Sequence, residues 1–222
     1  MGHISQEIHI QADGVTLNGS LAMYQESNGI VVFVQGIGSG RFSPRNKYIA
    51  NRLHNANIST LLIDLLTPGE RAIVRNRDQQ SNIDWLYTRL NTSLDWLTSQ
   101  KETTGLSIAL FGSNLGVAAA LKTAADRPQQ ISALVSWSGR PDLVIDSLPA
   151  IKAPTLLVAG KYDVTIVNAN RKAAEKFMTK CYLEILSETG HDLKETAKLD
   201  ELAELSCAWF QQHLPHNSKQ NT

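Results

Sequence analysis

The sequence has few cysteines, no excess of charge and no long apolar run. Its two cysteines, Cys181 and Cys207, match no metal-binding or redox spacing, so we expect buried, reduced thiols and no metal site. The 21 basic and 21 acidic side chains cancel, which argues against nucleic acid or an anionic membrane surface as the main partner. The longest apolar runs have the length of a β-strand and are too short to cross a bilayer.

The first residues also lack a targeting signal. Met1 to Gln6 has neither the charged start nor the apolar stretch of a signal peptide, so we expect a cytoplasmic protein. With 222 residues, 42% of them hydrophobic and 19% charged, the chain has the composition of a globular protein. One domain is the expectation at this length. We place it at residues 1–215, followed by a polar tail at residues 216–222.

The pattern of apolar residues predicts strands that alternate with helices. Residues 5–11 and 15–24 alternate between apolar and polar side chains around Asp13-Gly14, which predicts an antiparallel hairpin. The later strands are almost continuously apolar, as strands buried on both faces are; they are expected at 29–34, 60–63, 107–111, 133–135, 155–159 and 182–186. Helices are expected from Ser43-Pro44, with serine as the cap, and at 82–98, 115–125, 168–178 and 197–213. This order predicts a mostly parallel central sheet with helices on both faces.

Glycine-rich or polar segments follow four of these strands, at the end where open parallel sheets form their sites. They are Gln35-Gly36-Ile37-Gly38-Ser39-Gly40, Gly112-Ser113-Asn114-Leu115-Gly116, Gly160-Lys161-Tyr162-Asp163 and Thr189-Gly190-His191-Asp192. The last three place a sharp turn, an acid and a histidine in the order in which α/β hydrolases carry their catalytic triad.

The turn at residues 112–116 has the spacing of a nucleophile elbow, which joins a strand to a helix with a strained residue at its apex. Glycines two before and two after the apex are needed, because side chains there would collide. The glycines of this segment fit only if Asn114 is the apex. With Ser113 at the apex, the same places would hold Phe111 and Leu115, which are too large.

The chain resembles the small dienelactone-hydrolase-like α/β hydrolases from about residue 29 to residue 211. The segments that carry this resemblance are Ser43-Pro44-Arg45-Asn46, Leu62-Ile63-Asp64-Leu65-Leu66-Thr67-Pro68, Gly139-Arg140-Pro141-Asp142, Ala153-Pro154-Thr155-Leu156-Leu157 and Gly190-His191. The resemblance implies an α/β-hydrolase fold with an N-terminal antiparallel hairpin and no cap domain. Members of this family typically have serine at the elbow apex and His-Gly after the first buried strand. Here Asn114 and Gln35 stand at those places.

The resemblance also implies roles for individual residues. His191 would be the general base, Asp163 would orient it, and the backbone N–H groups of Ile37 and Leu115 would form the oxyanion hole. Two plainer interpretations remain open: Asp163 caps the next helix, and His191 is a surface residue. Asparagine lacks the hydroxyl that such a base activates, and loss of the nucleophile removed roughly 10⁶ of the rate in a well-studied protease.

Asn114 has three possible explanations: a natural loss of catalysis, a deliberate inactivating substitution, or a role in a different reaction. Asparagine tolerates a left-handed backbone better than most residues, so the elbow survives under all three. Deamidation to aspartate would restore a carboxylate nucleophile, and an intact mass without a unit gain would rule that out.

The segment from Gly36 to Gly40 also imitates a dinucleotide fingerprint, with Asp64 as the ribose-binding acid. The place of its third glycine is taken by Arg41, and the next helix begins too late to hold a pyrophosphate. We therefore expect no cofactor and interpret the segment as a wall of the oxyanion hole. Gln35, Arg41 and Arg140 are candidates for substrate contact, since arginines would attract a carboxylate or phosphate; the alternative is ordinary surface arginines.

The favoured interpretation is a hydrolase for small esters, lactones or thioesters, in which Asn114 has abolished or impaired activity. The alternative is a non-catalytic protein that keeps the cleft to bind a small ligand or a protein partner. A third possibility is that His191 activates water directly. We expect a shallow, open pocket for a small molecule, no nucleic-acid or membrane partner, and a monomer or homodimer.

Overall fold

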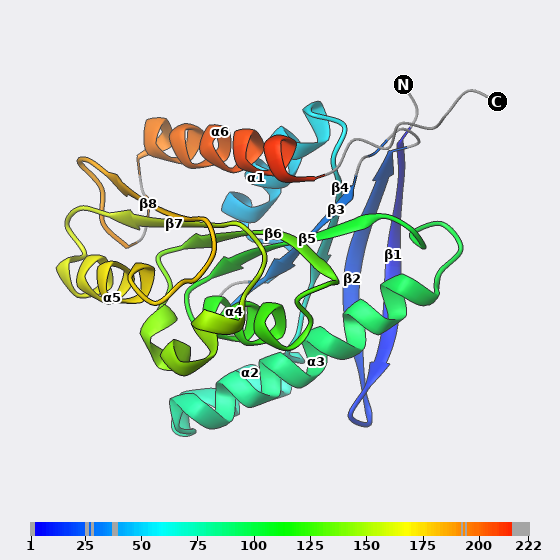
Figure 1. Ribbon diagram of the computed structural model, residues 1–222. Helices are drawn as coiled ribbons and strands as arrows, with labels where there is room; N and C mark the ends of the chain where they lie inside the picture. Colours follow the sequence, from blue (N-terminus) through cyan, green and yellow to red (C-terminus); the bar gives the residue numbers. More distant parts are fainter. Residues whose placement is uncertain are drawn as a thin grey trace.

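The computed structural model describes residues 3–24, 27, 29–36, 40–191, 193 and 195–214, with its elements shown in Figure 1. In these residues, eight strands form one sheet in the spatial order β1-β2-β4-β3-β5-β6-β7-β8. They are β1 (His3–Ala12), β2 (Val15–Tyr24), β3 (Gly29–Val34), β4 (Ser59–Ile63), β5 (Ser107–Ser113), β6 (Ile131–Trp137), β7 (Thr155–Gly160) and β8 (Cys181–Leu186). β1 and β2 form the expected antiparallel hairpin, β2 runs antiparallel to β4, and all later neighbours are parallel.

Helices cover both faces of the sheet. They are α1 (Pro44–Asn55), α2 (Pro68–Ile73), α3 (Gln79–Ser99), α4 (Gly116–Asp126), α5 (Val164–Ala174) and α6 (Thr196–His213), with short 3₁₀ helices η1 (Val74–Asn76) and η2 (Pro141–Ala150). α1 and α6 pack together on one face, whereas α3 and α4 pack together on the other, where η2 joins them (Figure 1). This is the layered arrangement that the alternation of strands and helices predicted.

The strand β3 shows why the central strands are apolar at every position. All six of its residues are buried. Ile30, Val32 and Val34 belong to the core beneath α3 and α4, while Val31 and Phe33 belong to the core beneath α1 and α6. Successive side chains of a strand point to opposite faces, so a strand between two helical layers needs an apolar residue at each place. Each such side chain contributes about 1.5–3 kcal/mol when fully buried.

Three predictions about helices need correction. α5 begins at Val164, four residues before the predicted start, because Asp163 caps it by accepting the Ile166 N–H at 3.3 Å. Ser43 precedes α1 as expected, but its side chain makes no capping hydrogen bond. The apolar pattern of the sequence did not predict α2, η1 and η2, because these helices are too short to show a clear apolar period.

The predictions about membranes and thiols have separate outcomes. No helix in the described ranges is long and apolar enough to cross a membrane. Both cysteines are free, but they are only partly buried rather than fully buried as expected. Burial still raises the pKa of the Cys181 thiol to about 12, which leaves little of the reactive thiolate at neutral pH.

Candidate active site

The turn between β5 and α4 has the backbone of an elbow. Asn114 sits at its apex with φ at +53°, in the left-handed region. A Cβ added to Gly116 would lie 2.3 Å from the carbonyl oxygen of Val34, and one added to Gly112 would lie 3.0 Å from the Cα of Val117. The two glycines therefore let the turn pack against β3 and the first turn of α4, which is the steric reason for their spacing around Asn114.

Backbone hydrogen bonds fix the apex, while the Asn114 side chain forms no hydrogen bond with the other described residues. The Asn114 N–H donates to the carbonyl of Trp137 at 3.3 Å, and the Asn114 carbonyl accepts the Val117 N–H at 3.2 Å. The Asn114 side chain is partly buried, and no other described residue forms a hydrogen bond with its carboxamide. The apex is thus held by its main chain, independently of the chemistry of the side chain.

The structure brings Asp163 and His191 together across 28 residues of sequence. The Nδ1 atom of His191 lies 3.0 Å from Oδ2 of Asp163. The other carboxylate oxygen, Oδ1, accepts the Ile166 N–H at the start of α5. Asp163 therefore makes both contacts: it caps α5 and lies beside His191. The imidazole is half exposed, with 47% of its side chain accessible, whereas the Asp163 side chain is 20% exposed.

Ser138, which the sequence reading did not single out, joins this pair. Its Oγ lies 2.9 Å from the same Nδ1 atom of His191. It follows β6 directly and precedes Gly139, so the available signal was a serine at the carboxyl end of a buried strand next to a glycine.

The segment after β3 lies against the elbow. A Cβ added to Gly36 would stand 2.9 Å from the Leu115 nitrogen and 3.1 Å from the Asn114 Cβ. Leu115 precedes α4, so its N–H belongs to the positive end of that helix. Ile37, the other residue expected in the oxyanion hole, lies outside the described residues, as does Asp192.

The candidate substrate contacts already have partners. Gln35 is buried and accepts a hydrogen bond from Asn46 Nδ2 at 2.8 Å, whereas its own Nε2 donor has no partner among the described residues. Arg140 forms two hydrogen bonds to Asp142, at 2.8 and 2.7 Å, which raise the pKa of Arg140 and lower that of Asp142. Arg140 is therefore neutralised by its neighbour rather than free to attract an anion.

Arg41 is likewise engaged. It forms ion pairs with Glu7 and, at 3.3 Å, with Asp64, whose Oδ1 also accepts the Arg41 backbone N–H at 2.9 Å. Arg71 binds the same Oδ1 at 2.6 Å. Both arginines therefore bind the Asp64 carboxylate. Its oxygens are occupied, which argues against the dinucleotide interpretation, in which they would bind ribose hydroxyls.

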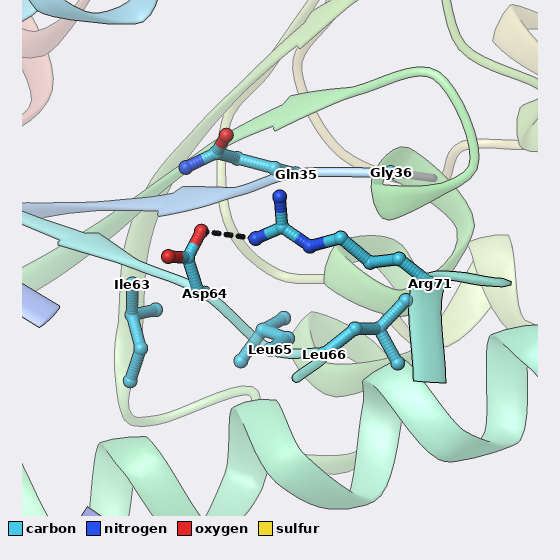
Figure 2. A pocket seen from close by; sticks show the side chains of 7 residues that line it. All are labelled: Gln35, Gly36, Ile63, Asp64, Leu65, Leu66 and Arg71. Carbon is cyan, nitrogen blue, oxygen red and sulfur yellow. Dashed lines mark hydrogen bonds and ion pairs between the residues drawn. The ribbon is translucent and has the colours of Figure 1, made fainter. Parts of the chain in front are cut away.

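Two adjoining cavities open at the carboxyl ends of β3 and β4. The first is lined by Gly36, which lies against the elbow, and Figure 2 shows Arg71 extending across it to Asp64 below Gln35. The second has a volume of about 250 Å³ and shares Asp64, Leu66 and Arg71 with the first. The remaining lining residues of the second are Thr16, Asn18, Arg41, Phe42, Thr67 and Pro68. Arg71 was not among the predicted site residues, because α2 was not predicted.

Comparisons with known proteins identify the family and the fold of the chain. The sequence model of the dienelactone hydrolase family matches residues 25–202. The chain belongs to the dienelactone hydrolase family. A crystal structure of dienelactone hydrolase from Anabaena variabilis is 40% identical, with a TM-score of 0.90, and the match covers 96% of this chain and 99% of that one. The predicted family and α/β-hydrolase fold are thereby confirmed.

Other members of this fold extend the comparison. Est1E from Butyrivibrio proteoclasticus shares the fold at a TM-score of 0.79 with 15% identity, over 93% of this chain and 98% of its own. Two Mycobacterium tuberculosis proteins, named as candidate phosphoribosyl transferases, are 40% identical over 209 residues. That match covers 94% of this chain and 46% of theirs, so the chain spans about half the length of these curated relatives.

Proposed function

We propose that this dienelactone hydrolase family member acts on small esters, lactones or thioesters through Asn114, Asp163 and His191, with the covalent step lost or impaired at Asn114. The observation that carries the proposal is the 3.0 Å contact between His191 Nδ1 and Asp163 Oδ2, beside an elbow whose apex keeps a left-handed backbone. Such a pair is what a hydroxyl nucleophile at the apex requires.

The proposed roles of Asp163 and His191 follow from which ring nitrogen of His191 carries the proton. The Asp163 carboxylate favours a proton on Nδ1 of His191, which leaves Nε2 unprotonated and able to accept one from a nucleophile. The N–H of Leu115, with that of Ile37 as its proposed partner, would stabilise the negative charge that develops on the substrate oxygen. The carboxamide of Asn114 offers no hydroxyl proton and is a poor nucleophile. A loss of roughly 10⁶ in rate corresponds to about 8 kcal/mol of lost transition-state stabilisation.

The cavities at the carboxyl ends of β3 and β4 favour a small, polar substrate. Their wall carries Arg41, Arg71 and Asp64, together with the amide donor of Gln35 that has no partner among the described residues. The substrate would therefore contact Gln35, whereas Arg41 and Arg140 would bind it only if their pairs with Glu7, Asp64 and Asp142 open. We propose a small-molecule substrate and a monomer or homodimer.

The test is hydrolysis of a short chromogenic ester by the chain as it stands and by its Asn114→Ser variant. We expect turnover only in the variant, and we expect a further His191→Ala change to abolish it. The matched control is Asn114→Ala, which removes the carboxamide without adding a hydroxyl and should stay inactive. Turnover by the unchanged chain that needs His191 would contradict the role given to Asn114. That result would favour direct activation of water by His191.

A second candidate function is that of a non-catalytic protein that binds a small ligand or a protein partner in the same cleft. Two substitutions in the machinery, Gln35 and Asn114, favour it, as does the buried Nε2 donor of Gln35 that lacks a described partner. Under this function His191→Ala and Asp163→Ala would leave ligand affinity within about twofold, and Asn114→Ser would remain inactive. Titration calorimetry with small carboxylic esters, alongside the kinetic assay, separates the two functions.

A further inference from the structure

Ser138 is a buried serine in an unusual backbone conformation beside the histidine. It is 1% exposed and has φ at +47°, in the left-handed region that serine rarely occupies. Its Oγ lies 2.9 Å from His191 Nδ1, so the imidazole has two oxygen partners on one nitrogen. Such a backbone costs about 1–2 kcal/mol and persists only where the surroundings hold it.

Three contacts hold this turn in place. The Ser138 N–H donates to the carbonyl of Val158 on β7 at 2.9 Å. A Cβ added to Gly139 would lie 2.2 Å from a methyl group of Val117, so the turn packs closely on the first residues of α4. The buried Asn170 of α5 donates to the Gly139 carbonyl at 3.0 Å. The backbone that carries the Ser138 side chain is therefore held by β7, α4 and α5 together.

The geometry excludes Ser138 as a substitute nucleophile. A base that activates a hydroxyl uses one ring nitrogen for the hydroxyl and the other for the carboxylate. Ser138 and Asp163 contact the same nitrogen, Nδ1. In addition, a serine with 1% exposure has no access to a substrate carbonyl.

We propose that Ser138 is a positioning residue, whose hydroxyl oxygen is a second acceptor for the Nδ1 proton of His191 and so fixes the tautomer and the ring orientation. A half-exposed imidazole with a single acceptor can rotate about its side-chain bonds, whereas two acceptors at 2.9 and 3.0 Å from one nitrogen restrain it. A proton on Nδ1 can be shared between the two oxygens, and it leaves Nε2 free as a base. The catalytic meaning of this arrangement rests on the function proposed above, but the tautomer itself does not.

The first test therefore needs no turnover. In long-range ¹H–¹⁵N NMR spectra of the unchanged chain above pH 8, we expect His191 to show the Nδ1–H tautomer. Ser138→Gly removes the hydroxyl and relieves the left-handed backbone, whereas Ser138→Ala removes the hydroxyl and keeps the strain. We expect both variants to show a mixture with the Nε2–H tautomer, although only Ser138→Ala should lose stability. The matched control is Ser136→Ala, two residues earlier on β6, since Ser136 is buried and its Oγ has no partner among the described residues.

An unchanged Nδ1–H tautomer in both Ser138 variants would overturn the proposal, because Asp163 alone would then set the proton. A shift in Ser138→Ala but not in Ser138→Gly would also overturn it, since backbone strain would be the cause.

The second test uses the Asn114→Ser background. There we expect Ser138→Gly to lower kcat about tenfold, with KM within about twofold, as for a group that orients a base without touching the substrate. A kcat that stays equal would contradict the catalytic part. If Asn114→Ser itself is inactive, the function proposed above fails, while the NMR result still decides the role of Ser138.

Discussion

Replacing Glu70 with glutamine should destabilise the protein strongly and remove part of its sensitivity to acid. Glu70 lies in α2, and each of its carboxylate oxygens accepts a hydrogen bond of 2.6 Å from Arg89 of α3. Arg89 is 1% exposed and also donates to the Leu65 carbonyl at 3.0 Å. The Thr67 N–H donates to Glu70 as well, which completes a capping box for α2.

The pKa of Glu70 supplies the magnitude. Hydrogen bonds from Arg89 lower that pKa from 4.5 to about 2. The difference of about 2.5 units is worth roughly 3 kcal/mol at about 1.4 kcal/mol per unit. Because the folded pKa lies below the unfolded one, this stabilisation is present in full above pH 4.5 and is lost as the pH falls towards 2. Glu70→Gln also leaves the buried Arg89 with only the longer ion pair of its Nε atom to Asp13, at 3.7 Å. We therefore expect a loss of about 3–5 kcal/mol at pH 7.

Urea denaturation at several pH values, followed by tryptophan fluorescence, measures this effect. The difference in unfolding free energy between the unchanged chain and Glu70→Gln should be constant above about pH 5.5 and shrink by roughly 3 kcal/mol towards pH 2. Glu102→Gln is the matched control, because Glu102 is exposed and has no ion pair within the described part of the chain. A difference below about 1 kcal/mol at pH 7, or one independent of pH, would refute the reasoning.

Three further predictions rest on other contacts. Gly116→Ala should lower the free energy of unfolding in urea by about 3 kcal/mol or more, because its Cβ would lie 2.3 Å from a main-chain oxygen of β3. Gly69→Ala, with open space around it, should change that free energy by less than about 1 kcal/mol, and equal effects would refute the steric account. The Cys181 thiol should be alkylated roughly 10³-fold more slowly than a free thiol at pH 8, since its pKa is raised from 9.0 to about 12. Peptide mapping would measure this rate, and a rate like that of a free thiol would contradict the prediction. In the Asn114→Ser background, Asp163→Asn should lower kcat by up to about 10⁴-fold. The melting temperature should stay within a few degrees, because asparagine still caps α5. A large fall in melting temperature would show that the cap needs the charge.

The elbow and the sheet could be predicted from sequence because steric rules acted on single positions. Only the spacing of Gly112 and Gly116 identified the apex, and the structure gives the reason in their contacts with α4 and β3. The continuous apolar character of β3 indicated burial on both faces, which the two cores now account for. Such signals are local, so one sequence contains them.

The polar wall of the site could not be predicted in the same way. The engagement of Arg41 by Asp64 and Glu7 depends on which segments the fold brings together. Arg140 and Asp142 are only two residues apart, but their pair depends on the conformation of the turn before η2, which no apolar period indicates. Arg71 reaches Asp64 only because a capping box forms α2, a helix too short to show an apolar period. Ser138 likewise became visible only when β6 placed it beside His191. Tertiary contacts decide such partners, whereas composition and periodicity do not.

The left-handed backbone of Asn114 has a practical consequence. Because main-chain hydrogen bonds and neighbouring glycines hold the apex, the shape of the cleft does not depend on which small polar side chain stands there. Under the function proposed above, the unchanged chain would bind the same labile carbonyl compounds that its serine variant hydrolyses, without consuming them. Candidate compounds could be soaked into crystals of the unchanged chain. A compound that binds without reacting would then be identified by its electron density, before any assay of turnover has found the substrate.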